Sequence, residues 1–170
     1  RVEQHDWQQP RRGDWLARLD ETVIDSERPV VLVAHSLGCV LVAAWARFSR
    51  HGAKVRGALL VAPGDVEQPD LAPALPGWAP ILRDPLPFPS LLVASRDDPR
   101  CRFERAEQLA QAWGIRLVDA GPRGHLNADL DPLAMMEKPG APDLDIGHHG
   151  LLHAGHSQFA HAAPRRCGAR

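Results

Sequence analysis

The run from residue 31 to residue 40 constrains the fold of this chain more than any other stretch. An apolar, β-branched segment ends at a His-Ser-Leu-Gly turn that contains Ser36, and a helical pattern begins directly behind it. A tight strand-to-helix turn of this kind, a nucleophile elbow, pushes the serine hydroxyl out into a cleft. The strand and helix backbones approach closely there, so small residues are needed on both sides, and Ala34 and Gly38 occupy those positions. The pattern predicts an exposed, nucleophilic Ser36.

The size and charge of the chain exclude several classes of protein. Its 170 residues fit one domain with a hydrophobic core, and a net charge of -1 offers no attraction for nucleic acid or an anionic membrane. No apolar run reaches the roughly 18 residues that a membrane span needs. Three cysteines are an odd number without paired spacing, which predicts no disulfide framework and favours a reducing, cytoplasmic location.

Apolar residues recur with helical spacing in three segments and form short, apolar strand-like runs in four others. Helices are predicted over 14–24, from directly behind Ser36 to about residue 51, and over 103–113. Strands are predicted over 30–34, 55–62, 91–94 and 115–118. Prolines are dense and no period emerges between 65 and 90, which predicts a long loop or lid. Strands that alternate with helices predict an α/β fold, with a parallel sheet covered by helices on both faces.

The character of the chain changes after about residue 128. Residues 1–128 carry the alternating strands and helices and are predicted to form one domain, whereas 129–170 shows little periodicity and is predicted to be a disordered tail or foreign to the fold. The tail holds five of the nine histidines: His148, His149, His153, His156 and His161. They lack an i, i+4 helical framework and carboxylate partners, so we predict no specific metal site and no cofactor. Adventitious metal binding by the tail is the alternative.

Residues that could form a Ser-His-Asp triad follow three of the predicted strands in the chain order nucleophile, acid, histidine. Ser36 follows the strand 30–34, Asp97 and Asp98 follow the strand 91–94, and His125 follows the strand 115–118. The carboxyl ends of parallel strands meet at one edge of a sheet, so these side chains are expected to lie close together. Alternatively, the two aspartates only cap the next helix, since aspartate is a common N-cap.

The chemistry of acyl transfer gives each candidate a role. A serine hydroxyl is a poor nucleophile until a neutral imidazole takes its proton, and a carboxylate must hold that imidazole in the right tautomer. Ser36 would attack, His125 would act as base and then as acid, Asp98 would orient His125, and the backbone N–H of Leu37 would donate to the oxyanion.

Other side chains invite competing interpretations. His35 could contact the substrate or pack beside the elbow, and the proline-rich loop offers candidate pocket walls. These candidates are Trp78, Leu86 and Phe88. Cys39 is interpreted as a small buried residue behind the elbow, and Cys101 as an ordinary thiol, with a reactive thiol as the alternative.

With these residues in view, the chain resembles the small α/β-hydrolases of the YdeN and retinoblastoma-binding-protein-nine type. The matching segments are Val33–Cys39, Ala94–Cys101, Gly124–Ala128 and, ahead of the first helix, Gln4–Pro10. The resemblance covers roughly residues 2–128. It implies a compact serine hydrolase fold with the triad Ser36, Asp98 and His125, and it favours Asp98 over Asp97 as the acid.

The chain departs from this family at both ends. The family has a further strand and a glycine-rich loop ahead of the residue that matches Arg1, and that loop would carry the second oxyanion donor. The fold expected here is therefore a small three-layer α/β-hydrolase that lacks its first strand. At the other end, 129–170 looks like an out-of-frame reading of the family's final segment.

The expected function is hydrolysis of a small-molecule acyl ester, with amides and thioesters as alternative substrates. The runner-up is a weak or inactive hydrolase fold that serves as a protein-interaction domain, although nothing in the sequence indicates a protein partner. Neither nucleic acid nor a membrane is an expected partner.

Overall fold

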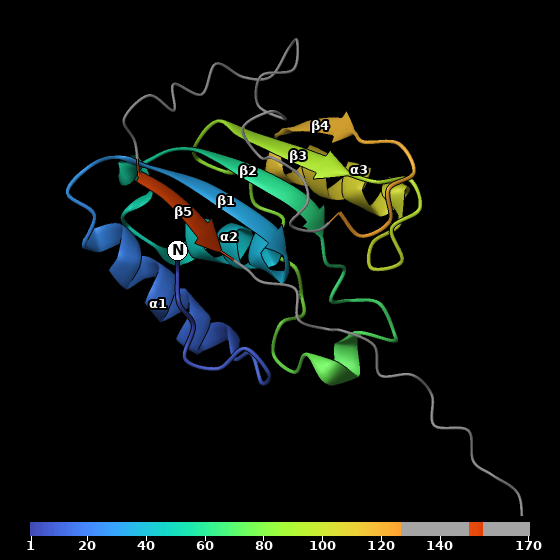
Figure 1. Cartoon of the computed structure of the whole chain (residues 1–170), viewed down its shortest axis with the longest axis horizontal. Coiled ribbons are helices and arrows are strands. Elements are labelled where there is room, and N and C mark those ends of the chain that lie inside the picture. Colours follow the sequence, from blue (N-terminus) through green and yellow to red (C-terminus); the bar gives the residue numbers. More distant parts are fainter. Residues whose placement is uncertain (127–149, 155–170) are drawn as a thin grey trace, which may run out of the picture.

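The computed structural model describes residues 1–126 and, as backbone alone, 150–154. Its described strands form one five-stranded, fully parallel sheet in the order β4-β3-β2-β1-β5 (Figure 1). The strands are β1 (Val30–Ser36), β2 (Val55–Pro63), β3 (Ser90–Ala94), β4 (Arg116–Asp119) and β5 (Gly150–Ala154). The helices are α1 (Arg12–Ile24), α2 (Leu37–Phe48) and α3 (Phe103–Trp113), with short 3₁₀ turns η1 (Gly52–Lys54) and η2 (Ala72–Ala74). The predicted α/β-hydrolase architecture with a parallel sheet is confirmed.

Most predicted elements agree with the observed ones to within a few residues. Helix α1 begins at Arg12, two residues ahead of the predicted start, and Asp14 lies in its first turn, where a negative charge interacts favourably with the helix dipole. Helix α2 begins at Leu37, directly after the turn serine. The helical pattern predicted to begin directly behind Ser36 is therefore confirmed.

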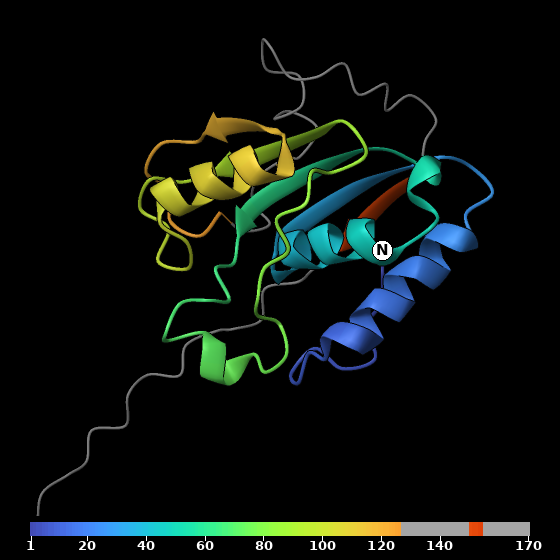
Figure 2. The same cartoon turned by 180° about the vertical axis from the view of Figure 1, so that it is seen from behind.

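Alternate residues of the central strands are buried on opposite faces of the sheet. Leu32, Leu60 and Leu92 belong to the larger apolar cluster, together with the buried side chains of α1, α2 and α3. Figure 2 shows α2 and α3 in front of the sheet on this face. Val31 and Val33 belong to a second cluster on the other face, with Leu126 packed among them. Both faces of β1 are buried, but the described helices cover one face, so the predicted helices on the second face are not found among the described residues.

The segment between β2 and β3 is a long loop, as predicted, but its apolar side chains are not exposed in the manner of an open lid. Val66, Leu75, Trp78 and Ile81 are all buried in the larger cluster. The indole Nε1 of Trp78 donates a hydrogen bond of 2.8 Å to the carbonyl of Pro10. Burial of these four side chains fixes the loop against the body of the domain.

Strand β5 is a feature that the sequence pattern did not predict. It pairs in parallel with β1 from Val30 opposite Gly150 to Ala34 opposite Ala154. The expectation of a tail without strands is therefore wrong for 150–154, because pairing depends on an available strand edge more than on local pattern. The rest of the tail and the predicted boundary at 128 lie outside the described residues.

Two further observations concern the described part of the chain alone. None of its helices has the length and apolar character required to cross a bilayer. In the same residues, no three side chains of the metal-ligating types gather closely enough to hold an ion. The histidine side chains of the tail, on which the metal-binding alternative depends, lie outside the described residues.

Candidate active site

The turn at Ser36 has the strained backbone that a nucleophile elbow requires. Ser36 has φ 54° and ψ -119°, a conformation that is uncommon for any residue other than glycine. Such strain persists only where the surrounding structure enforces it, and it concentrates at functional sites. Here β1 ends at Ser36 and α2 starts at Leu37, so no loop residue separates the strand from the helix. The side chain of Ser36 is consequently presented at the carboxyl edge of the sheet.

Three side chains far apart in the sequence meet at this edge. The Oγ of Ser36 lies 2.9 Å from Nε2 of His125, 89 positions away in the chain. The other ring nitrogen, Nδ1, lies 2.9 Å from both carboxylate oxygens of Asp98. The side chain of Asp98 is only 2% exposed and that of His125 is 16% exposed, so water competes little for their hydrogen bond. The geometry is that of a serine–histidine–carboxylate relay.

Asp97, the other aspartate of the loop, lies in a different environment. Its Oδ1 accepts hydrogen bonds of 2.7 Å from the hydroxyl of Ser95 and 2.7 Å from the backbone N–H of Gly124. These two hydrogen bonds, the one from Ser95 having the larger effect, hold the pKa of Asp97 below its ordinary value. Asp97 therefore anchors the loop that carries His125, while Asp98 contacts the imidazole itself.

Ser95 is a residue that the sequence reasoning missed. Its buried hydroxyl also accepts a hydrogen bond of 2.8 Å from the backbone N–H of Arg123 and lies 3.0 Å from the carbonyl oxygen of Gly121. It thus ties the end of β3 to the loop that precedes His125. The available signal was a small polar residue directly after a buried strand, a common turn residue with no distinctive spacing.

The predicted oxyanion donor, the N–H of Leu37, is the first of α2. The first N–H groups of a helix have no intrahelical acceptor, and the dipole adds a partial positive charge there. Its position next to Ser36 therefore suits a developing negative charge on an acyl oxygen.

The structure brings one of the four pocket candidates close to the triad. The ring of His35 lies 4.9 Å from that of His125, centroid to centroid. Trp78 is 0% exposed and packs edge-on against Trp15 at 5.4 Å, so no face of it is available to a substrate.

Phe88 and Leu86 belong to the opposite edge of the sheet. Phe88 packs against Trp45 at 6.4 Å just before β3 begins, whereas Ser36 stands where β1 ends. In parallel strands these positions differ by roughly 15–20 Å. The N–H of Leu86 donates to the carbonyl of Trp113, where α3 ends ahead of β4. Their place in a proline-rich loop suggested a lid, but burial drew these apolar side chains into the core.

Neither described cysteine has the environment of a nucleophile. Cys39 is fully buried behind the elbow, as predicted, with Sγ 3.3 Å from the carbonyl oxygen of Val61. Burial, together with the nearby carboxylates of Asp65 and Asp98, raises the pKa of Cys101 to about 12. Burial likewise raises the pKa of Cys39 far above that of a free thiol.

We therefore expect native Cys39 and Cys101 to resist iodoacetamide at pH 8. A thiol with a pKa of about 12 is ionised in roughly one molecule in ten thousand at that pH, and the thiolate is the reactive form. Peptide mapping by mass spectrometry measures the outcome, with alkylation in denaturant as the positive control. Rapid native alkylation of Cys101 would restore the reactive-thiol alternative.

Together the parallel sheet, the elbow and the hydrogen-bonded Ser, His and Asp side chains define a protein of the α/β-hydrolase class. A family model described as serine hydrolase matches residues 1–132, so the chain belongs to the serine hydrolase family. A comparison with curated proteins found no match.

Solved structures of other hydrolases share the fold of this chain. A YdeN-like hydrolase from Pectobacterium atrosepticum is 30% identical, with a TM-score of 0.63, over 76% of this chain and 65% of that protein. The YdeN gene product of B. subtilis is 22% identical, with a TM-score of 0.58, over 73% of this chain and 69% of that one. A monoacylglycerol lipase from Paleococcus ferrophilus shares the fold at 12% identity and a TM-score of 0.55, over 69% and 68%. This chain thus spans less than two thirds of the Pectobacterium hydrolase.

Proposed function

We propose that this protein hydrolyses small acyl esters through a Ser36–His125–Asp98 triad and a covalent acyl-enzyme. One observation supports the proposal above the others. His125 lies 2.9 Å from Ser36 Oγ through one ring nitrogen and 2.9 Å from Asp98 through the other. A carboxylate that accepts the Nδ1 proton leaves Nε2 unprotonated, which is the tautomer that can accept the proton of the serine.

In the first half-reaction Ser36 Oγ attacks the acyl carbonyl carbon while its proton passes to Nε2 of His125. The carbonyl oxygen becomes an oxyanion that accepts a hydrogen bond from the N–H of Leu37, a donor that costs no reorganisation because α2 already holds it in place. The imidazolium, stabilised by Asp98, then gives its proton to the departing alcohol. The acyl group remains as an ester of Ser36.

In the second half-reaction a water molecule attacks the acyl-enzyme. Nε2 of His125 takes a proton from this water, the oxyanion forms again beside Leu37, and the same proton returns to Ser36 Oγ as the carboxylic acid leaves. The same groups thus act in both halves with base and acid roles exchanged. Thioesters and amides share the acyl carbonyl and are alternative substrates.

A fluorophosphonate probe tests the proposal because it reacts covalently with activated serines. The probe is expected to add one adduct to the native protein, mapped to Ser36, and none to Ser36→Ala. Ser26→Ala, in the loop between α1 and β1, is the matched control and is expected to label like the native protein. Intact mass and peptide mapping measure the adduct.

Equal labelling of Ser36→Ala, or no labelling of a folded native chain, would contradict the proposal. The second result, joined with a protein partner that binds native and Ser36→Ala chains equally well, would favour a hydrolase fold that serves as an interaction domain.

A further inference from the structure

The turn after β2 brings a glycine against the proposed nucleophile. Strands β1 and β2 pair in register from Val31 opposite Gly57 to His35 opposite Val61, but Ser36 then pairs with Pro63, so β2 carries one extra residue at this end. That residue, Ala62, has φ 47°. Bulges of this kind redirect a strand end beside active sites. Here Gly64, two residues after Ala62, donates its N–H to the carbonyl of Ser36 at 3.2 Å.

Glycine at position 64 is explained by the space beside it. The φ of Gly64 lies outside the left-handed region, so the backbone alone does not require glycine. A Cβ at this position would lie 3.5 Å from Ser36 Oγ and 3.6 Å from the backbone nitrogen of Leu37. Those are ordinary van der Waals distances, so an alanine fits the free protein. Its methyl group would, however, contact both the attacking oxygen and the oxyanion donor and would narrow the space beside them.

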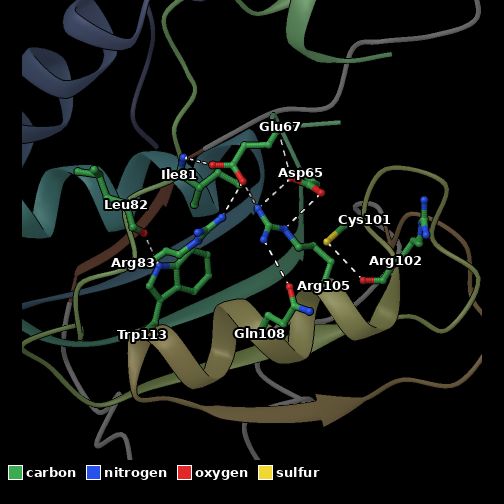
Figure 3. Close-up of polar contacts among 10 residues, drawn as sticks. All are labelled: Asp65, Glu67, Ile81, Leu82, Arg83, Cys101, Arg102, Arg105, Gln108 and Trp113. Atoms are coloured by element: carbon green, nitrogen blue, oxygen red, sulfur yellow. Dashed lines mark hydrogen bonds and ion pairs between the residues drawn. The ribbon is translucent and has the colours of Figure 1, made fainter. Parts of the chain in front are cut away.

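The direction of that methyl group is fixed by the residues that follow. The N–H of Asp65 donates to the carbonyl of Arg100 at 3.0 Å, next to the Asp98 loop. Figure 3 shows Arg105 of α3 reaching Asp65 and Glu67 together, with an Nε to Asp65 Oδ2 distance of 3.3 Å. These carboxylates and Arg105 are largely buried, so the ion pairs are shielded from water.

Glu67 extends the same cluster to the far side of the loop. Its Oε1 accepts the N–H of Ile81 at 2.9 Å, and its Oε2 pairs with Arg83 at 2.8 Å (Figure 3). Both ends of the loop are thus joined through one carboxylate. A side chain at position 64 could not swing away by a shift of the turn.

We infer that Gly64 determines the size of the acyl group that the proposed site accepts. The inference rests on the proposed function. The leaving group must face His125 Nε2, which protonates it, whereas the three atoms nearest a Cβ at Gly64 belong to Ser36 and Leu37. A substituent at position 64 would therefore lie beside the Ser36 oxygen and the Leu37 N–H, the two groups that act on the acyl carbonyl.

The test compares native protein with Gly64→Ala on two pairs of esters. The first pair, p-nitrophenyl acetate and p-nitrophenyl 2-methylpropanoate, differs only in the acyl group, which carries two additional methyl groups on its α-carbon in the second ester. The second, p-nitrophenyl and 1-naphthyl acetate, differs only in the alcohol. We expect kcat/KM for the branched acyl ester to fall about 10-fold or more relative to acetate, the usual cost of a misfitting methyl group. The ratio within the alcohol pair should change less than about threefold.

Gly52→Ala in η1 is the matched control. Its added Cβ would meet the Cγ of Pro87 at 3.6 Å, a contact as close as that at Gly64, but at the opposite edge of the sheet. Both ratios should stay at native values in this variant. Circular dichroism and thermal midpoints check that both alanine variants fold.

Failure of the role inferred for Gly64 and failure of the proposed hydrolase function give different results. An active native enzyme whose acyl ratio is unchanged in Gly64→Ala, or whose alcohol ratio shifts equally, overturns the role of Gly64 alone. A native protein that neither reacts with fluorophosphonate nor turns over acetate overturns the proposed function, and the inference with it. A selective loss of the branched acyl ester supports both.

Discussion

Replacement of His125 by alanine is expected to lower kcat for an acyl ester by about 10⁴- to 10⁶-fold. The imidazole is the group within hydrogen-bond distance of Ser36 Oγ that can accept its proton, at 2.9 Å. Without it the serine stays protonated and the departing alkoxide receives no proton. Steady-state turnover of p-nitrophenyl acetate, corrected for the uncatalysed rate, measures the loss. KM should change far less than kcat because the imidazole acts on the reacting atoms.

His51→Ala is the matched control for this variant. His51 follows the end of α2 and precedes η1, at the edge of the sheet opposite Ser36, so its removal should leave turnover unchanged. A His125→Ala enzyme with more than a tenth of native activity would contradict the triad.

Substitution of each aspartate in turn tests which of them orients His125. Asp98→Asn should cost on the order of 10⁴-fold in kcat, because an amide can hold the imidazole in the wrong tautomer. Asp97→Asn should cost less, since Asp97 contacts Ser95 and the backbone of Gly124 but not the imidazole. The reverse order of effects would assign the acid to Asp97.

Trp78→Ala is expected to lower the free energy of unfolding by about 3–5 kcal/mol, the usual cost of truncating a buried aromatic side chain. Trp78 is 0% exposed, contacts Trp15 edge-on, and joins the 64–89 loop to the amino-terminal segment through its bond to Pro10. Urea denaturation followed by circular dichroism measures the change. Marginal stability makes a loss of this size large enough to unfold part of the population.

Trp7→Ala is the control for that experiment. Trp7 also contacts Trp15 edge-on, at 5.2 Å, but it is only partly buried, so its removal should cost less than half as much. Trp78→Phe keeps an aromatic ring but leaves the carbonyl of Pro10 without its donor, and should lie between the two. If Trp78→Ala instead had native stability and an altered ester preference, the result would contradict this prediction and support Trp78 as a wall of the substrate pocket.

Much of the fold could be predicted because each element carries a local pattern. The helix over 103–113 was predicted with the bounds of α3, and the four strands of the main body lie within two residues of their predicted ends. Strand β5 was missed because its pairing depends on the open edge of β1 rather than on its own composition. Trp78 and Phe88 were misplaced because loop membership says little about which apolar side chains the core will bury.

The residues of the candidate site could be nominated from the sequence, but their contacts could not. Chain order and strand ends were sufficient to nominate Ser36, His125 and the pair Asp97 and Asp98, since parallel strands place their carboxyl ends at one edge of the sheet. The family resemblance then favoured Asp98. The different contacts of Asp97 and Asp98 are made to residues 27 positions away and depend on side-chain direction, which no local pattern encodes.

Local sequence therefore specified the elements and the types of chemistry they carry, because hydrophobic period and turn strain act over a few neighbouring residues. Folding in three dimensions determined which of those groups touch. The 2.9 Å contact between Ser36 and His125 joins residues 89 apart, and the closeness of Gly64 to the serine depends on a bulge seen only when β2 pairs with β1. Such contacts are set by packing and strand register, which involve the whole sheet at once.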